Sequence, residues 1–329
     1  MPVTVVVGGQ FGSEGKGKVA HFLAKKQKAT YVVRCGGANS GHTVYDEEGR
    51  KWAFRHLPTA AILPCINLVL SSGSYIDIDV LLNEIESAGI EDNRLFIDPY
   101  AVIISKQNKL KESKLELEKM IGSTGSGTGA AVAQRVLRDN STVFAKDIEV
   151  LQKYISDTKE LLRNALSRNE RVIIEGTQGF GLSLLHSQLY PYVTSRDTTA
   201  AGFLSEVGLS PFDVDEIALV IRSFPIRVAG DSGCLPREIA WSDITNESKS
   251  KTPIIEYTTV TNKVRRVARF DKDIVLKAIL VNQPTSIFLN HLDYIGSHEK
   301  ILKFVKDVEL QIERRIDCIG TSPETIITL

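Results

Sequence analysis

Short β-branched runs, glycine-rich loops and amphipathic segments follow one another from the start of the chain. Residues 3–7 are apolar and β-branched and predict a strand, and residues 19–24 have the apolar spacing of a helix. The segment between them is rich in glycine. A second strand is predicted at residues 31–34, before a second glycine-rich loop at residues 36–43. Residues 43–57, which are polar at their centre, predict a hairpin.

Strands and helices continue to alternate through the rest of the chain, with a third glycine-rich loop at residues 122–129. Such alternation favours a parallel sheet with helices on its faces. We therefore predict an α/β protein with a central, mainly parallel sheet flanked by helices. A single domain over residues 1–329 is expected, because no repeat or linker divides the chain. The pattern predicts strands at 67–71, 94–97, 171–174, 217–221 and 286–289, helices at 77–88, 106–120, 150–167 and 301–314, and a polar loop at 241–252.

The composition narrows the classes of protein to which the chain can belong. With 43% hydrophobic and 24% charged residues over 329 positions, it is typical of a globular protein and not of a disordered one. Forty basic residues balance forty acidic ones, so we expect neither nucleic acid nor a membrane as a partner. No apolar run approaches the roughly 20 residues of a membrane-spanning helix. The four cysteines lie far apart without zinc-ligand spacing, which predicts a reduced, cytoplasmic protein.

The first glycine-rich loop, residues 12–18, is a candidate phosphate site. It lies where a strand gives way to a helix, and the backbone N–H groups and helix dipole at such a place attract phosphate. It is not a Walker A loop, because Gln10 stands where that pattern has glycine and Gly17 where it has serine or threonine. A purely structural turn is the alternative.

His42 and Gln178 each follow a predicted strand in a glycine-rich loop. The carboxyl ends of parallel strands form the ligand-binding edge of an open α/β sheet. His42 is therefore a candidate catalytic group, with a structural histidine as the alternative. Gln178 could present its amide to a nucleobase, although this signal is weak by itself.

Two segments near the C-terminus carry polar groups suited to acids and nucleotides. Residues 258–266 combine threonine hydroxyls with Lys263, Arg265 and Arg266, which suits a dicarboxylate or a phosphate, although an exposed basic loop would look the same. The run Asn290-His291-Leu292-Asp293 follows an apolar strand. It is similar to the N-K-x-D element with which GTP-binding proteins read guanine, and an ordinary turn is the alternative.

Taken together, these motifs resemble those of the adenylosuccinate synthetase family, in the family's order and through most of the chain. The resemblance is to the short form of the family, whose fold is related to that of P-loop nucleoside triphosphatases. The matching sequences are G-x-E-G-K-G-K from residue 12, G-G-x-N-x-G-H-T from 36, I-G-S-T-G-x-G from 121, E-G-x-Q-G from 175, Y-P-Y-V-T-S from 190 with Thr198-Thr199, and the loop at 258–266.

The resemblance implies a carbon–nitrogen ligase. In this family the 6-oxygen of a purine nucleotide attacks the γ-phosphate of a nucleoside triphosphate, and the amine of aspartate then displaces the 6-phosphate. Phosphorylation is needed because the amide-like oxygen is a poor leaving group. Mg²⁺ is the implied cofactor, ligated by Ser13 and the Gly41 carbonyl. A homodimer is also implied, in which Arg138 reaches the partner's acceptor nucleotide, with Arg135 as the nearby alternative.

The family's functional residues carry over by motif. Ser13, Lys16, His42 and Gln178 are the implied catalytic residues: Lys16 would neutralise the transferring phosphoryl group, His42 would contact the leaving diphosphate, and Gln178 would lie near the 6-oxygen. The acceptor nucleotide would be held by Ser13, Asn39, Thr124, Arg138, Gln178, Thr194, Val228 and Lys263, the aspartate by Thr259, Val260, Thr261, Lys263 and Arg265, and the triphosphate by Gly12, Glu14, Gly15, Lys16, Gly17, Gly41, His42, Thr43, Arg265, Asn290, Asp293 and Gly320.

The chain departs from the family pattern at position 13. The ordinary enzymes have an aspartate there, which takes the N1 proton of inosinate, and Ser13 lacks that carboxylate. A smaller side chain leaves space beside C2 of the purine, where guanine carries an amino group and hypoxanthine a hydrogen. The same change marks a phage branch of the family that makes 2-aminoadenine nucleotides. We therefore expect dGMP as the acceptor.

The donor motifs allow more than one triphosphate. His291 replaces the family's guanine-reading lysine, Asn262 and Lys263 replace a glycine and an arginine, and residues 320–323 replace S-T-G-P. These changes favour ATP or dATP, whereas Asp293 favours GTP. Two rival functions stay open: an ordinary synthetase acting on IMP with GTP, and a nucleotide-gated switch, which would need neither His42 nor the aspartate loop.

Overall fold

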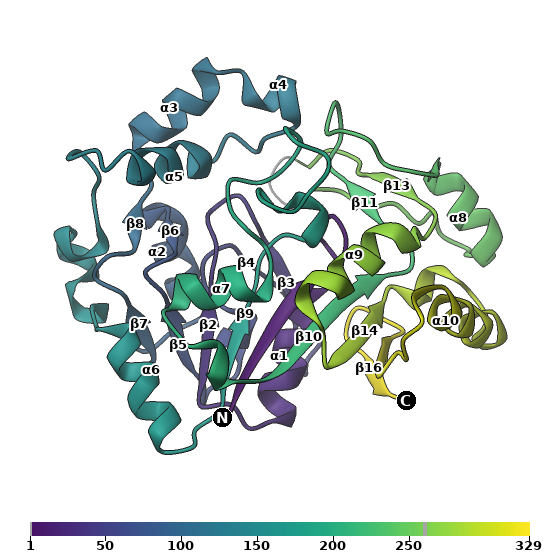
Figure 1. Ribbon diagram of the computed structural model, residues 1–329, viewed down its shortest axis with the longest axis horizontal. Helices are drawn as coiled ribbons and strands as arrows, with labels where there is room; N and C mark the ends of the chain where they lie inside the picture. Colours follow the sequence, from purple (N-terminus) through teal and green to yellow (C-terminus); the bar gives the residue numbers. More distant parts are fainter. Residues whose placement is uncertain (1, 259–261) are drawn as a thin grey trace.

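The computed structural model describes residues 2–258 and 262–329, and a nine-stranded sheet forms its centre (Figure 1). The strand order is β16-β15-β14-β10-β1-β9-β2-β5-β7. All neighbouring pairs are parallel except β15 and β16, which confirms the predicted mainly parallel sheet. The strands are β1 (Val3–Gly8), β2 (Tyr31–Arg34), β5 (Asn67–Leu70), β7 (Leu95–Ile97), β9 (Val172–Glu175), β10 (Val214–Arg222), β14 (Ser286–Asn290), β15 (Cys318–Gly320) and β16 (Ile326–Thr328).

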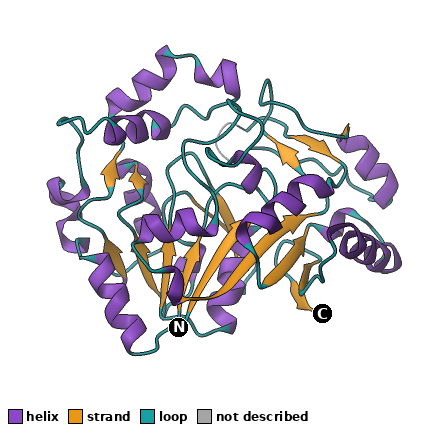
Figure 2. Cartoon of the chain, viewed as in Figure 1, coloured by secondary structure: helices purple, strands orange, loops and turns teal. Residues whose placement is uncertain are grey.

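Helices cover both faces of this sheet (Figure 2). Successive side chains of a strand point to opposite faces, so Val5 and Val7 belong to one apolar core and Val6 to the other. Burial on both faces explains why these strands read as continuous apolar runs. One core includes helices α6 (Thr158–Ser167), α7 (Ala200–Val207), α9 (Lys272–Asn282) and α10 (His298–Ile312), and the other includes α1 (Lys16–Lys26) and α2 (Ile78–Ser87).

The remaining elements lie beyond the carboxyl ends of the parallel strands, towards which β1 runs from the labelled N-terminus (Figure 1). The predicted hairpin forms at this end as β3 (His42–Tyr45) and β4 (Lys51–Phe54). The other elements there are the parallel pair β6 (Tyr75–Ile76) and β8 (Val102–Ile103), helices α3 (Lys106–Lys114), α4 (Leu117–Ile121), α5 (Thr128–Val136) and α8 (Trp241–Ser248), and a three-stranded antiparallel sheet of β11 (Ile226–Arg227), β13 (Arg266–Ala268) and β12 (Glu238–Ile239).

The predicted loop at 241–252 is wrong, because residues 241–248 form α8. The segment is polar, but Trp241 and Ile244 lie three positions apart and are both buried. Residues three apart share one face of a helix, and these two pack with Phe224 and Val267 in a small apolar cluster. Tertiary packing therefore outweighs the polar composition.

Two predicted helices are interrupted. Within 150–167, a 3₁₀ helix at Glu149–Tyr154 ends before α6 begins, and Asp157 caps α6 by accepting the N–H groups of Lys159 and Glu160 at 3.1 Å. Within 106–120, α3 and α4 are separated at Glu116, whose φ is 50°. An N-cap aspartate marks a helix start, so the first break could have been recognised.

None of the helices in the described part of the chain combines the length and the apolar character needed to cross a membrane.

Candidate active site

A cavity of about 500 Å³ lies where the chain leaves β1, β2 and β9. Its walls come from loops that are far apart in the sequence, including the three glycine-rich loops, residues 190–195 and 226–229, and Lys263 and Arg265. The predicted site residues that line it are Gly12, Ser13, Lys16, Asn39, Gly41, His42, Thr124, Gln178, Thr194, Val228, Lys263 and Arg265. The structure therefore brings together most of the predicted acceptor residues.

The first glycine-rich loop wraps around the carboxylate of Glu14. Glu14 Oε1 accepts the N–H groups of Gln10 at 3.1 Å and Gly12 at 2.8 Å, and Oε2 lies 2.6 Å from Lys16 Nζ. Both members of the Glu14–Lys16 pair are buried. The loop is thus built for an anion, but the carboxylate of Glu14 takes the Gly12 N–H and the Lys16 ammonium. Their roles towards a triphosphate stay predictions.

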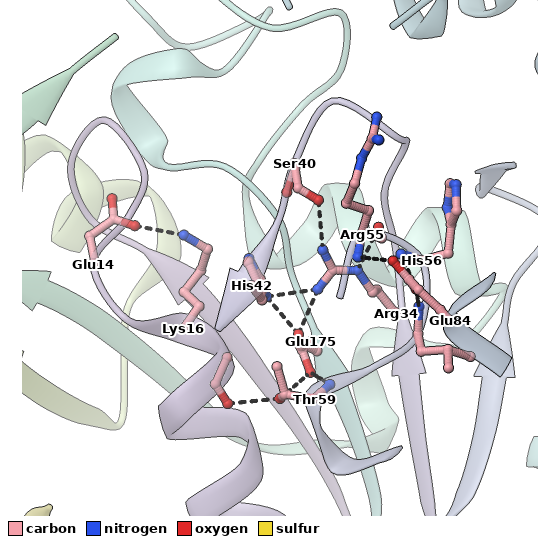
Figure 3. A network of polar contacts seen from close by, with 12 residues as sticks. Glu14, Lys16, Arg34, Ser40, His42, Arg55, His56, Thr59, Glu84 and Glu175 are labelled. Atoms are coloured by element: carbon pink, nitrogen blue, oxygen red, sulfur yellow. Dashed lines mark hydrogen bonds and ion pairs between the residues drawn. The ribbon is translucent and has the colours of Figure 1, made fainter. Parts of the chain in front are cut away.

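His42 belongs to a buried polar network at the ends of β2 and β9 (Figure 3). Its Nδ1 is 2.6 Å from Glu175 Oε1, and Arg34 Nη1 donates to the same carboxylate oxygen at 2.6 Å. Thr59 completes the network, since its backbone N–H and its hydroxyl both lie 2.8 Å from Glu175 Oε2. Arg34 also donates to the Ser40 carbonyl at 3.0 Å, which fixes the loop that carries His42.

This network sets the protonation state of His42. Burial, followed by the charge of Arg34, lowers the pKa of His42 to about 4. Burial alone would raise the pKa of Glu175, but the hydrogen bond with His42 and the charge of Arg34 lower it to about 2. Near neutral pH the pair is therefore a carboxylate and a neutral imidazole. The carboxylate accepts the Nδ1 proton, which leaves Nε2 as the unprotonated ring nitrogen.

Two non-glycine residues on the cavity wall have left-handed backbone conformations. They are Ser13, with φ 55°, and Gln178, with φ 64°. Such conformations persist only where the surrounding structure enforces them, and they are concentrated at functional sites. Ser13 is held by its neighbours: its hydroxyl accepts a hydrogen bond from Arg265 Nη1, and its carbonyl accepts one from Arg222 Nη1 at 2.8 Å. His291 Nε2 lies 3.2 Å from the same carbonyl.

The opposite wall is formed by α4 and by the loop that leads into α5. Glu112, on α3, accepts the N–H groups of Gly127 and Gly129 at 2.7 Å, and so caps α5. Glu118 pairs with Lys263 at 3.0 Å across the mouth of the cavity, and both side chains are more than half exposed. This exposed pair connects α4 to the predicted aspartate loop at residues 258–266.

The predicted donor residues lie on the far side of the first glycine-rich loop. Asn290 Nδ2 donates to the Glu14 carbonyl at 2.8 Å, which joins β14 to the loop. Gly15 has φ 90°, and a Cβ there would come within 2.7 Å of Asn290 Nδ2, so the position requires glycine. Lys18 donates to the Ser322 carbonyl at 2.9 Å, and burial lowers its pKa to about 8. The C-terminal loop that carries Gly320 thereby adjoins Asn290.

The remaining predicted residues are placed less directly. Thr259, Val260 and Thr261 lie outside the described residues. Thr43 is half-buried in β3 beside His42. Arg138 follows α5, is exposed, and does not line the cavity, whereas Arg135 donates to the Ser72 carbonyl at 2.6 Å.

Sequence reasoning missed the charged residues that support the site. Glu175 opens the E-G-x-Q-G match, and its place at the end of a buried strand could have marked it. Arg34, Arg222 and Glu256 carry no local signal, because Arg34 pairs with Glu175 and Arg222 with Glu256, and the two members of each pair are far apart in the sequence. Within residues 2–258 and 262–329, no three His, Cys, Asp or Glu side chains form a group that could hold a metal ion.

Comparison with known proteins agrees with a nucleotide-binding α/β ligase. The profile of the adenylosuccinate synthetase family matches residues 5–147 and 142–306. Adenylosuccinate synthetases of Methanococcus aeolicus and Methanococcus vannielii are 38% and 40% identical, over 98% and 100% of this chain and 98% of each relative. That of Methanocaldococcus jannaschii is 39% identical over 98% of this chain and 94% of its own. The chain therefore belongs to the adenylosuccinate synthetase family.

Two solved structures share the fold. The cyanophage S-2L succinoaminodeoxyadenylate synthetase (PurZ), bound to dGMP and to dATP as an energy donor, has a TM-score of 0.86 and 28% identity, with 99% of this chain and 95% of that chain covered. Adenylosuccinate synthetase from Plasmodium falciparum has a TM-score of 0.87 and 21% identity, with both chains fully covered. The predicted α/β fold is confirmed, and the chain is an adenylosuccinate synthetase-type ligase that forms a carbon–nitrogen bond.

Proposed function

We propose that this ligase condenses L-aspartate with the 6-position of dGMP at the expense of ATP. The product would be 2-amino-2′-deoxy-N6-succinyladenylate, a precursor of 2-aminoadenine deoxynucleotide. The observation that carries the proposal is Ser13 on the cavity wall, where the family resemblance implies an aspartate in the ordinary enzymes. The likeness to cyanophage PurZ, whose structure holds dGMP and dATP, supports it.

The surroundings of Ser13 suit a guanine better than a hypoxanthine. An aspartate at this position would form an ion pair with Arg265, whose Nη1 already contacts the Ser13 hydroxyl. That carboxylate would occupy the space beside the base, and a serine leaves it open for the exocyclic amine. Gln178, on the same wall, has a side-chain amide that can hydrogen-bond the 6-oxygen.

The chain's own residues supply much of the electrostatics that phosphoryl transfer needs. Lys16 lies on the cavity wall and would turn from Glu14 to an incoming phosphoryl group. His42 is neutral near pH 7, and the approach of a polyanion would raise its pKa. Glu175, by holding the Nδ1 proton, directs any further proton to Nε2. His42 could then hydrogen-bond the leaving diphosphate.

Mg²⁺ fits this site as an ion held mainly by phosphate. The two predicted ligands, the Ser13 hydroxyl and the Gly41 carbonyl, are neutral oxygens on the cavity wall, and Glu14 is committed to Lys16. Mg²⁺ prefers oxygen ligands and is often bound by one or two protein groups together with substrate phosphates. When bound, it would neutralise charge on the triphosphate.

ATP or dATP is the proposed donor. The element that reads the donor base has His291 in place of lysine, and its ring lies against Tyr294, with centroids 5.4 Å apart. Asp293 remains available to a guanine edge, so GTP is the alternative. The PurZ structure, with dATP as its energy donor, supports an adenine nucleotide.

A homodimer is part of the proposal. Arg138 is exposed beside Val136 and Leu137, which are 70% and 75% exposed. Contiguous exposed apolar surface often marks a protein–protein interface, and arginine is enriched at such interfaces. A partner's Arg138 would complete the acceptor phosphate site that Asn39, Thr124 and Thr194 begin.

The acceptor is tested by supplying dGMP, GMP and IMP together with aspartate and MgATP, and by identifying the succinylated product by mass spectrometry. The proposal expects dGMP to be consumed first. The Ser13→Asp variant should lose dGMP turnover by at least about 100-fold, and gain turnover of IMP, because the carboxylate both fills the space and accepts the N1 proton. Ser13→Ala is the matched control, and should keep the preference for dGMP. Faster consumption of IMP by the unaltered protein would refute the assignment.

The second candidate is the ordinary reaction, with IMP as acceptor and GTP as donor. The archaeal relatives, which are named adenylosuccinate synthetases, favour it, as does Asp293 in the donor element. The same competition assay separates the two reactions, because the succinylated products of dGMP and of IMP differ in mass.

A further inference from the structure

Glu256 lies at the edge of the site, in none of the roles described above. Its carboxylate is 15% exposed and serves two arginines. Arg222, whose side chain is fully buried, pairs with it through Nη2 and again through Nη1 at 3.3 Å. Arg265 Nη1 lies 3.6 Å from Glu256 Oε2, and Tyr294 donates its hydroxyl to Glu256 Oε1 at 3.0 Å. One carboxylate therefore holds two guanidinium groups.

Both arginines converge on Ser13. Arg222 Nη1 donates to the Ser13 carbonyl at 2.8 Å, and Arg265 Nη1 donates to the Ser13 hydroxyl. These contacts hold the left-handed backbone of Ser13 and aim its side chain. Both donors pair with the same carboxylate, so Glu256 is linked to Ser13 through two arginines without contacting it.

Glu256 and Arg265 also face each other across a hairpin. The Arg265 N–H donates to the Glu256 carbonyl at 2.9 Å, and the Thr258 N–H donates to the Lys263 carbonyl at 2.9 Å. The hairpin carries the predicted aspartate loop. The base of that loop is therefore locked to Ser13 by the side chains of Glu256 and Arg265, and to itself by its backbone.

The cations at this place differ in how closely they are paired. Among the described residues, the ion pairs of Lys16, Arg222 and Arg265 involve two carboxylates, those of Glu14 and Glu256. Arg265, at 3.6 Å, is the more loosely paired of the two arginines and is the one on the cavity wall. An anionic substrate group would therefore meet Arg265, whereas Arg222 stays with Glu256.

We propose that Glu256 is a positioning residue of the ligase, which holds Arg222 behind Ser13 and aims Arg265 at the aspartate. It acts through the two arginines and does not contact a substrate. The inference rests on the proposed function only for the choice of dGMP as the assayed acceptor. Asp at residue 13 would compete with Glu256 for Arg265, so this alignment suits a serine.

The test is steady-state kinetics of the full chain with Glu256→Gln and Tyr294→Phe, varying aspartate and acceptor separately. Glu256→Gln should lower kcat by about 30-fold and raise KM for aspartate by about tenfold, because Arg265 loses its aim. The Kd for dGMP, measured by calorimetry, should stay within twofold. Tyr294→Phe removes one hydrogen bond to Glu256 and leaves both arginines paired, and should raise KM for aspartate about threefold.

Glu238→Gln is the matched control. Glu238 pairs with Arg266 at 2.6 Å, next to Arg265 in sequence, but the pair is more exposed and does not contact Ser13. It should change kcat and KM by less than about 1.5-fold. A folded Glu256→Gln protein with unchanged KM for aspartate would overturn the inference, as would equal losses in Glu238→Gln. If Glu256→Gln does not fold, an unchanged KM for aspartate in Tyr294→Phe overturns it.

Failure of the proposed function is distinguishable from failure of this inference. An unaltered protein that consumes IMP and not dGMP refutes the acceptor assignment. The effect of Glu256→Gln on KM for aspartate is then measured with IMP, and still decides the role of Glu256.

Discussion

The two walls of the cavity are built in different ways. On the side of β2 and β9, Arg34, His42 and Glu175 are buried at strand ends, and the Glu175 carboxylate accepts hydrogen bonds of 2.6 Å from both Arg34 and His42. On the other side, α4 and the aspartate loop are joined by Glu118 and Lys263, which form an exposed ion pair. Buried charges are costly to leave unpaired, whereas an exposed pair contributes little.

The two walls therefore suit different tasks: the buried wall suits the chemical step, and the exposed wall suits the entry and binding of substrates. The buried wall keeps His42 in one tautomer and one position, as proton transfer and charge stabilisation require. The exposed wall is held by weak contacts that substrates can replace. We expect substitutions on the buried wall to change kcat and stability together, and substitutions on the exposed wall to change KM with little effect on stability.

The largest effect is expected for Glu175→Gln. Without its charge Arg34 is left buried and unpaired, and His42 loses the acceptor that fixes its tautomer. The free energy of unfolding should fall by about 3 kcal/mol, and kcat by at least about 100-fold. Urea unfolding and product formation measure the two.

Asp213→Asn is the control for this substitution. It breaks the Arg163–Asp213 pair, whose atoms lie 2.7 Å apart and whose arginine is 47% exposed, away from the cavity. It should affect stability without affecting kcat. If Glu175→Gln kept kcat within threefold of the unaltered protein, the buried wall would have no catalytic role.

Arg138→Ala should raise KM for the acceptor by about tenfold, because a charge-assisted contact to the phosphate is lost from the partner's side. Stability should not change, since Arg138 is exposed. With the acceptor kept well below its KM, mixing equal amounts of Arg138→Ala and Lys16→Ala chains should give about one quarter of the sites full activity. These sites lie in mixed dimers that combine an intact Lys16 with the partner's intact Arg138. Arg135→Ala chains are the comparison, because Arg135 is tied to Ser72 within its own chain. No recovery on mixing would place Arg138 outside the partner's site.

Acid should weaken the buried wall. Burial and nearby arginines lower the pKa of His42 to about 4, and those of His56 and His291 to about 3. These groups bind fewer protons when folded than when unfolded, where their pKa is about 6.5. Their stabilising contribution is therefore complete above about pH 6.5 and is lost as the pH falls towards 4.

For each of these histidines, the expected change in the free energy of unfolding between pH 7 and pH 4 is on the order of 3 kcal/mol. His42→Gln should remove part of this dependence. Urea titrations at several pH values measure the slopes for this variant and for the unaltered protein. Equal slopes in the two proteins would mean that His42 is not held neutral by the fold.

The smallest effect is expected for Glu118→Gln. The pair with Lys263 is exposed, so the free energy of unfolding should change by less than about 0.5 kcal/mol. Release of Lys263 should lower KM for aspartate about twofold, because substrate no longer competes with Glu118. Glu116→Gln is the control, since Glu116 pairs with Lys119 on its own segment. A large loss of stability in Glu118→Gln would remove the distinction between the walls.

Much of the fold could be predicted from local patterns. Parallel strands that are buried on both faces have continuous apolar runs, so 3–7, 31–34 and 286–289 were recognisable. α8 was not, because its stability comes from Trp241 and Ile244 packing on residues from other elements. The break before α6 had a signal in Asp157, which went unused.

The sequence alone determined which residues could take part, because glycine-rich loops after strands and the ordered motifs depend on local backbone needs and on spacing along the chain. Ser13, His42 and Gln178 were identifiable on that basis. Only the tertiary structure decided which charges meet. Glu175 reaches Arg34 and His42, and Glu256 reaches Arg222 and Arg265, through the folding of distant segments. Burial then makes these pairs strong, and burial is a property that no stretch of sequence has by itself.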